Sequence, residues 1–185
     1  MFATRKSLAA VVLAVACALM LGACGSDNSN DTGQTTPPPP GNGADRAFVT
    51  AVLPLHEKAV AVAIIGQRKG GKYVKGLSLR IAGTQPLETA RLRAIGSALF
   101  TAGVPIGSLG VAPTKAAEID LKALRNAKPF EQAFLNAMIP LHEATIALCK
   151  AEIAKGSQVD LKTTSQAIID SESNQLKSMR KRLTS

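Results

Sequence analysis

An eleven-residue segment occurs twice in this chain, and the two copies begin 86 positions apart. The first is AFVTAVLPLHE at 47–57 and the second is AFLNAMIPLHE at 133–143, and seven of the eleven positions are identical. The copies hold the only two histidines, His56 and His142, at equivalent places. Internal repetition dictates architecture. The sequence therefore predicts two copies of one supersecondary unit.

Both copies have the apolar period of a helix. In the first copy, one side of the expected helix carries Phe48, Val52, Leu55, Ala59 and Val62. In the second copy it carries Phe134, Met138, Leu141 and Leu148. We expect a helix from Asp45, as its N-terminal cap, to Gln67, and another from Pro129 or Phe130 to Lys155. Pro54 and Pro140 lie well inside these runs and predict kinks.

Two further helices are expected at 72–99 and 160–183, with a plausible break near Gly83 and Pro86. With one residue inserted, Ile81, Glu88 and Leu92 correspond to Ile168, Gln175 and Met179. The repeats are thus helical hairpins at about 45–99 and 129–183. They are joined by a crossover, 100–128, with a short helix that Thr114 caps and that ends at Asn126. This pattern predicts an all-α protein, an antiparallel four-helix bundle with a ferritin-like connection.

The first 44 residues predict export and anchoring. A basic pair, Arg5-Lys6, precedes an apolar run from Ser7 to Met20, which is short for a membrane span. Leu-Gly-Ala-Cys24 then resembles a bacterial lipobox, so 1–23 is expected to be a lipoprotein signal peptide and Cys24 the lipidated residue. The alternative is a plain secretory signal. Residues 24–44, rich in Pro, Gly and Asn, are expected to be a disordered tether at the extracytoplasmic face of the cell membrane, periplasmic or extracellular.

Composition narrows the partners of the domain at 45–185. The chain carries a net charge of +9, with one Tyr and no Trp. Exported location and the lack of a basic-aromatic motif argue against nucleic acid. The charge indicates either proximity to anionic membrane surfaces or a solvated basic surface. Cys149 is the one thiol left after processing and lipidation, so no disulfide framework is expected.

The second copy also carries candidate metal ligands. Met138, His142 and Cys149 fall within about 40° on a helical wheel. Thioether, imidazole and thiolate groups suit Cu(I) better than Mg²⁺ or Ca²⁺. Cys149 lies about 10 Å beyond His142 along the axis, so it joins the site only if the kink or a partner helix changes the geometry. Met179 is a further candidate sulfur donor. In the alternative interpretation, these are ordinary core residues and the histidines are hydrogen-bonded.

Other chemistries fit less well. A di-iron site in a bundle of four helices needs Glu-x-x-His on two helices, and neither Glu88 nor Glu172 has a histidine three residues later. Nothing supplies an oxyanion site for Cys149 as a nucleophile. We therefore expect a protein that is not an enzyme.

The run KPFEQAFLNAMIPLHEA at 128–144, with Ile168, Glu172 and Met179 downstream, resembles the DUF305 family. The segment AAEIDLKAL at 116–124 is similar to a short helix that the family places before its second hairpin. The resemblance covers 45–183 and implies an exported four-helix protein with a ferritin-like fold, in which some members bind copper through Met and His. Within the family's Met-x-x-His-His pattern, only Met138, His142 and His56 are retained, since Leu55 and Leu141 replace the first histidines.

From these observations we expect a lipid-anchored protein that binds copper or another soft metal for metal handling. The ligands would be Met138 and His142, with His56, Cys149 and Met179 as further candidates. The alternative is a metal-free structural or protein-interaction module of the cell envelope, favoured by the leucines at two family histidine positions. The sequence identifies no protein partner.

Overall fold

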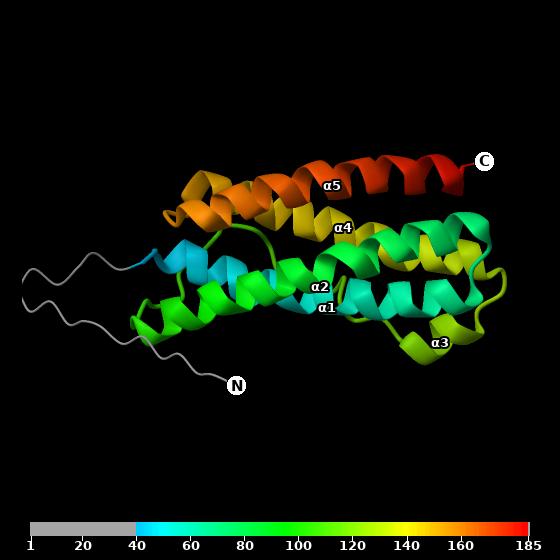
Figure 1. Cartoon of the computed structure of the whole chain (residues 1–185), viewed down its shortest axis with the longest axis horizontal. Coiled ribbons are helices and arrows are strands. Elements are labelled where there is room, and N and C mark those ends of the chain that lie inside the picture. Colours follow the sequence, from blue (N-terminus) through cyan, green and yellow to red (C-terminus); the bar gives the residue numbers. More distant parts are fainter. Residues whose placement is uncertain (1–39, 185) are drawn as a thin grey trace, which may run out of the picture. The chain divides into compact units, whose positions relative to one another are not determined.

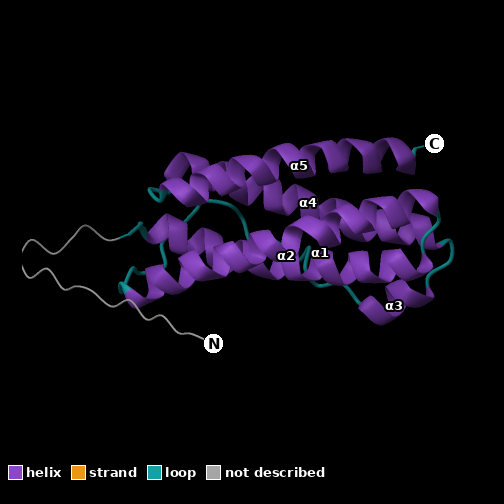
Figure 2. Cartoon of the chain, in the orientation of Figure 1, coloured by secondary structure: helices purple, strands orange, loops and turns teal. Residues whose placement is uncertain are grey.

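The computed structural model describes residues 40–184, which form five helices and, within that range, no strand (Figures 1 and 2). In chain order the helices are α1 (Gly43–Lys69), α2 (Lys72–Thr101), α3 (Leu121–Asn126), α4 (Phe130–Lys155) and α5 (Val159–Leu183). The all-α prediction is confirmed. The predicted signal peptide, the lipidation site Cys24 and most of the tether lie outside the described residues.

The four long helices share one hydrophobic core. α1 packs mainly against α2, and α4 packs mainly against α5, while α1 also lies along α4. The core takes residues from all four, among them Phe48, Leu77, Phe134 and Leu161, each with no exposed surface. Pro37–Ser185 forms a compact unit by itself. Because this unit contains its own core, we expect it to fold without the preceding residues.

The start of α1 differs from the prediction, because Asn42 and not Asp45 is its N-terminal cap. The Asn42 side chain accepts hydrogen bonds from the backbone of Ala44 and Asp45, and Asp45 bonds back to the Asn42 backbone in a capping box. The Asp45 carboxylate also accepts from the backbone N–H groups of Ser157 and Gln158, both at 3.0 Å. One side chain thus ties α1 to the turn between α4 and α5. The helix begins at Gly43, inside the segment expected to be tether.

Two expectations for the middle of the chain are wrong. α2 is continuous through Gly83 and Pro86, because the buried residues before and after them hold it against the core. The short helix begins only at Leu121 and is capped by Asp120, whose side chain accepts from the backbone N–H groups of Lys122 and Ala123. Thr114 instead forms a local turn, accepting from the backbone of Ala116 at 3.1 Å.

Pro54 and Pro140 lie inside α1 and α4, and neither proline begins its helix. Each lacks an N–H, so the carbonyl four residues earlier loses its helical partner. The kinks remain a prediction. By length and composition α1 is apolar enough to cross a membrane, with a mean hydropathy of 1.7 over its most apolar window. Half of that window is buried in the core, which accounts for its apolar character.

Candidate functional site

His56 lies in the centre of the core with carboxyl groups on both sides. The α1 apolar stripe places it between α2 and α5, with no exposed surface. Its Nδ1 is 3.8 Å from Oε2 of Glu88 on α2, and its Nε2 is 3.7 Å from Oε1 of Glu172 on α5. Both distances are too long for hydrogen bonds. Neither ring nitrogen has a hydrogen-bond partner among the described residues.

The two flanking helices are joined directly beside this histidine. Gln85, one turn before Glu88, donates from Nε2 to Oε1 of Glu172 at 2.8 Å. Glu172 and Gln85 are both buried, and the other carboxyl oxygen of Glu172 has no hydrogen-bond partner within the described part of the chain. The cluster is therefore polar, and only some of its groups have hydrogen-bond partners. Unpaired polar groups in a core destabilise the fold, so their presence suggests a functional role.

His142 lies in the same core and is held by an amide. Its Nε2 is 3.0 Å from Oε1 of Gln175 on α5, and Gln175 in turn donates to Oγ of Ser171 at 3.1 Å. Nδ1 of His142 has no partner with hydrogen-bond geometry in residues 40–184. The Met138 backbone carbonyl is nevertheless near enough to favour the protonated ring. Both histidines are fully buried, His56 on α1 and His142 on α4.

Burial sets the charge of this cluster. It lowers the pKa of His56 to about 4, with a further decrease from His142. It also lowers the pKa of His142, although the hydrogen bond with Gln175 and the nearby Met138 carbonyl oppose the change. Burial raises the pKa of Glu172 well above its usual value, and the charge of Glu88 adds to this. At neutral pH both imidazoles are thus neutral, the form in which a histidine ligates a metal.

The predicted sulfur donors lie in the same core. Met138, Cys149 and Met179 have no exposed surface. Burial and the charge of Glu172 raise the pKa of the Cys149 thiol, and the nearby Ser165 side chain opposes this only in part. Because the thiolate is the ligating form, Cys149 is a poor donor in this environment. Across residues 40–184, no group of three or more His, Cys, Asp or Glu side chains is arranged to hold a metal ion.

Sequence reasoning missed the polar partners of the histidines: Gln85, Glu88, Glu172 and Gln175. One signal for them was present. Helix α2 reads Gln85-Pro-Leu-Glu88, and α5 reads Glu172-Ser-Asn-Gln175, with corresponding residues 87 positions apart. The same two residue types thus occur in reversed order, one turn apart, on the helices that follow the two histidines.

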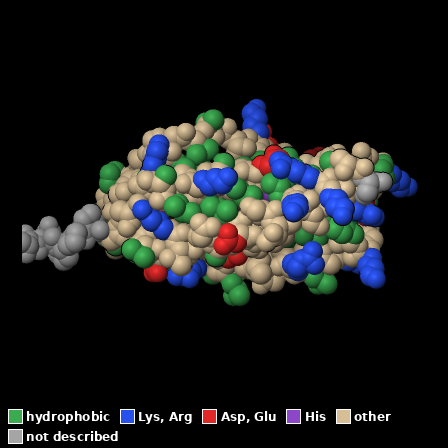
Figure 3. All heavy atoms as spheres, turned by 90° about the horizontal axis from the view of Figure 1, so that it is seen from above, with side chains coloured by type: hydrophobic (Ala, Val, Ile, Leu, Met, Phe, Trp, Pro, Cys, Tyr) green, Lys and Arg blue, Asp and Glu red, His purple; other side chains and the backbone are tan. Residues whose placement is uncertain are grey.

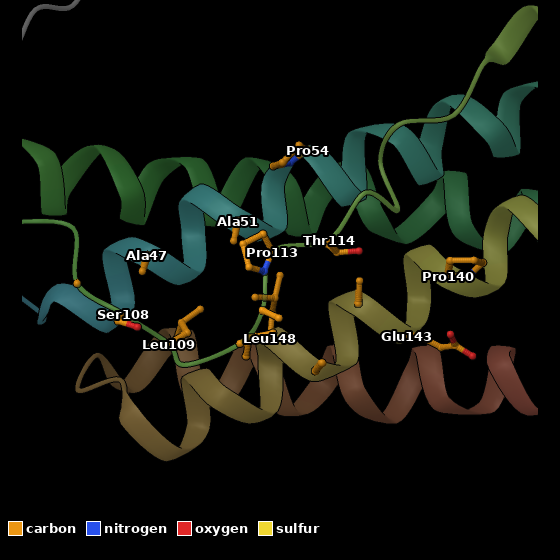
Figure 4. Close-up of a pocket in the computed structure, with 15 residues that line it drawn as sticks. Ala47, Ala51, Pro54, Ser108, Leu109, Pro113, Thr114, Pro140, Glu143 and Leu148 are labelled. Atoms are coloured by element: carbon orange, nitrogen blue, oxygen red, sulfur yellow. The ribbon is translucent and has the colours of Figure 1, made fainter.

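A pocket of about 740 Å³ lies between α1 and α4, beside the prolines of the two repeated segments. Its walls are mostly small apolar residues of both helices, and the segment 107–114 closes it (Figure 4). Pro54 and Pro140 lie at one end, and Glu143, which pairs with Arg180, lies at its edge. None of the residues that line it is His, Met or Cys. The pocket therefore offers no soft metal donor, and the candidate site is the buried cluster.

Comparison with known proteins agrees with this fold. The family model "Domain of unknown function (DUF305)" matches residues 106–183 and confirms the resemblance there. Among solved structures, CopM in the Cu(I)-bound form superposes with a TM-score of 0.64 at 23% identity, over 76% of this chain and 95% of that one. CopM in the apo form gives 0.64 at 22% identity, over 76% and 96%. No curated protein matches the chain significantly.

Proposed function

We propose that the protein binds copper or another soft metal, because residues 106–183 match the DUF305 family model. CopM, whose fold it shares, has been solved in Cu(I)-bound, Cu(II)-bound and Ag-bound forms. The proposed role is metal handling without catalysis. The metal is cargo, held by side chains of the core.

The observation that carries this proposal is the incomplete bonding of two buried histidines. Both nitrogens of His56 and Nδ1 of His142 lack hydrogen bonds among the described residues, although all three atoms are buried. A buried polar atom without a partner costs about 1–3 kcal/mol. A cation would bind to the unprotonated nitrogen of such a ring, and a neutral imidazole loses no proton when it ligates in this way.

Among the candidate ligands, Met138 and His142 are the best pair. They are one turn apart on α4, both are buried, and an imidazole with a thioether suits Cu(I). His56 is the next candidate, because neither of its buried ring nitrogens has a hydrogen-bond partner among the described residues. Met179 lies on α5, one turn after Gln175. Cys149 comes last, since its thiol must lose a strongly held proton before it can ligate.

We also propose that the domain arose as a duplicated helical hairpin forming a four-helix bundle. An offset of 86 relates His56 to His142, and an offset of 87 relates Gln85 to Glu172 and Glu88 to Gln175. Each histidine then faces the equivalent residue of its own hairpin: Glu88 for His56 and Gln175 for His142. The Gln85–Glu172 hydrogen bond joins two equivalent positions, as expected near an approximate two-fold axis.

The proposed location is the extracytoplasmic face of the cell membrane, with lipid at Cys24. The lipobox-like Leu-Gly-Ala-Cys24 supports this, as does the apolar run before it. Metabolic labelling with a fatty acid, compared between the full chain and Cys24→Ser, tests the anchor separately from the metal.

A Cu(I) competition titration on reduced protein comprising residues 37–185 tests the metal site. We expect one-to-one binding that Met138→Leu and His142→Gln each weaken about tenfold or more. Leu141→Ala is the matched control: Leu141 is equally buried beside His142 but has no donor atom. It should lower stability without changing the affinity of the folded protein. Equal weakening in all three variants would assign the loss to unfolding.

A second function is favoured by one contact, the hydrogen bond between His142 and Gln175. If His142 serves only to form that hydrogen bond, the domain is a metal-free structural or interaction module. Absence of competition with a chelator of micromolar affinity would support this second function. Affinity capture from the cell envelope would then replace metal titration.

A further inference from the structure

The net positive charge of the domain is concentrated at one end. We define the basic end as residues 67–76, 121–131 and 177–184, where α1 turns into α2, α3 follows the crossover, and α5 finishes (Figure 1). These segments hold eleven Lys and Arg and one acidic residue, Glu131. The rest of residues 40–184 holds nine Lys and Arg and ten Asp and Glu. The basic end thus accounts for the whole positive charge of the described chain.

These eleven side chains are all exposed, and Lys and Arg are dense at the right-hand end of the surface in Figure 3. They are Arg68, Lys69, Lys72, Lys75, Lys122, Arg125, Lys128, Lys177, Arg180, Lys181 and Arg182. Two ion pairs occur here, Arg180 with Glu143 at 2.7 Å and Arg182 with Glu131 at 2.6 Å. Most of this charge is therefore not neutralised by the described part of the protein.

Favourable interactions within the chain explain only some of the lysines and arginines at the basic end. Basic residues in the last turns of α1 and α5 interact favourably with the helix dipole. Lys72 and Lys75 do the opposite, because they occupy the first turn of α2, where positive charge is unfavourable. That helix start has no acidic residue in its first turn, and Gly71 makes no side-chain cap. The arrangement favours an anion brought by a partner over charges within the domain.

The basic end also has an apolar component. A pocket of about 410 Å³ lies between the last turns of α1 and the start of α3. Its apolar wall is Ala61, Ile64, Ile65 and Leu121, and its cationic rim is Arg68, Lys69 and Arg125. Ile64 is 43% exposed. A purely polar polyanion would bind the cationic rim but would leave the apolar wall exposed to water. An amphiphile with an anionic headgroup would contact both the apolar wall and the cationic rim.

We propose that the basic end docks on an anionic phospholipid surface, with the cationic rim on the headgroups and Ile64 at the interface. The eleven-to-one charge ratio supplies the electrostatic attraction, and the apolar wall selects lipid over other polyanions. The surface needs neither copper nor the lipid anchor, so its test is independent of the proposed function.

Vesicle co-sedimentation of residues 37–185 tests the proposal, with phosphatidylcholine vesicles prepared with and without phosphatidylglycerol. We expect binding only to the anionic vesicles, weakened by salt. Lys69→Gln with Lys122→Gln should weaken it on the order of tenfold. The control, Lys150→Gln with Lys155→Gln, removes equal charge from exposed lysines elsewhere and should change binding about twofold or less. Ile64→Ser should weaken the binding that persists at high salt.

Three results would overturn the proposal. The first is equal binding to neutral and anionic vesicles. The second is equal loss in the two double variants, which would mean that net charge and not this surface matters. The third is retention by a soluble polyanion, such as heparin, without binding to anionic vesicles, which would assign the basic end to a polymer. Circular dichroism of each variant distinguishes these results from misfolding, since all the substituted side chains are exposed.

Discussion

Gln85 of α2 and Glu172 of α5 form a buried hydrogen bond of 2.8 Å beside His56. The two residues are 87 positions apart, and the proposed duplication would make their places equivalent. One is an amide and the other an acid, so the pair itself is not symmetric. A neutral Glu172 can donate a hydrogen bond from its own O–H group, which an ionised carboxylate cannot.

Glu172→Gln should therefore flatten the pH dependence of stability. Burial raises the pKa of Glu172 well above the value near 4.5 that we expect in the unfolded chain. The folded protein thus binds the extra proton, and the free energy of unfolding falls as the pH rises above 4.5. The variant has no such proton. We expect it to be more stable than the wild type at pH 8 by about 1–2 kcal/mol, measured by urea unfolding at pH 5 and pH 8.

Glu57→Gln is the control, because Glu57 is exposed and paired with Arg93. Its effect should be below about 1 kcal/mol at either pH. A Glu172→Gln variant that is less stable than the wild type at pH 8 would contradict the prediction. That result would mean that Glu172 is ionised in the fold and that His56 carries the matching proton.

Glu152 should titrate near neutral pH because it lies beside Asp45. Burial and the neighbouring Asp45 carboxylate raise the pKa of Glu152 to about 8. Burial alone would raise the pKa of Asp45, but the backbone bonds from Asn42 and Gln158 and the neighbouring Glu152 side chain outweigh it and lower that pKa. A ¹³C carboxyl titration followed by NMR should show Glu152 changing near pH 8. Asp45→Asn removes the neighbouring charge and should move that midpoint to lower pH.

The same titration contains its own check. Stability contributed by Asp45 is present above pH 3.8 and is lost as the pH falls through its lower folded pKa. The Asp45 signal should therefore remain that of a carboxylate throughout the Glu152 transition. A single shared transition for both carboxyl groups below pH 5 would show that they do not form an acid–carboxylate pair.

Substitution by alanine should change the stability of the protein in opposite directions at two helical glycines, Gly66 and Gly83. A Cβ at Gly66 of α1 would lie 2.2 Å from the Ser78 hydroxyl and 2.5 Å from the Phe134 ring, so the helices must move apart. A Cβ at Gly83 of α2 meets nothing within 4 Å. We expect Gly66→Ala to destabilise by about 1–3 kcal/mol and Gly83→Ala to stabilise by about 0.5–1 kcal/mol. Thermal unfolding measures both, and the same sign for both would contradict the packing of α1 against α2 and α4.

The Cys149 thiol should be inert in the folded domain. It has no exposed surface, and burial together with Glu172 raises its pKa, so the reactive thiolate is scarce. We expect no labelling by a thiol reagent at pH 8 in residues 37–185, and one label per chain after addition of urea. Rapid stoichiometric labelling without denaturant would mean that the core opens readily. That opening would provide metal with a route to His56 and His142.

The sequence alone determined the helices and the placement of both histidines on an apolar face. The helix expected at 160–183 is found at Val159–Leu183, and the expected start at Pro129 or Phe130 is found at Phe130. These features depend on residues within about one turn of each other, so apolar spacing records them locally. Even there, the prediction of Asp45 as the cap was wrong, because Asn42 is the cap. Asp45 has a second role, as acceptor for Ser157 and Gln158, that the local sequence does not show.

Only the tertiary structure decided what the histidines face. His56 lies between Glu88 and Glu172, which are 32 and 116 residues away in the chain, so no local spacing relates the three. The same holds for the basic end, which collects charge from three separate segments, and for Gly66, which differs from Gly83 only in its neighbours. Contacts of this kind depend on how the long helices pack and on where the crossover leads. Periodicity shows that a side chain is buried, whereas packing determines its partner.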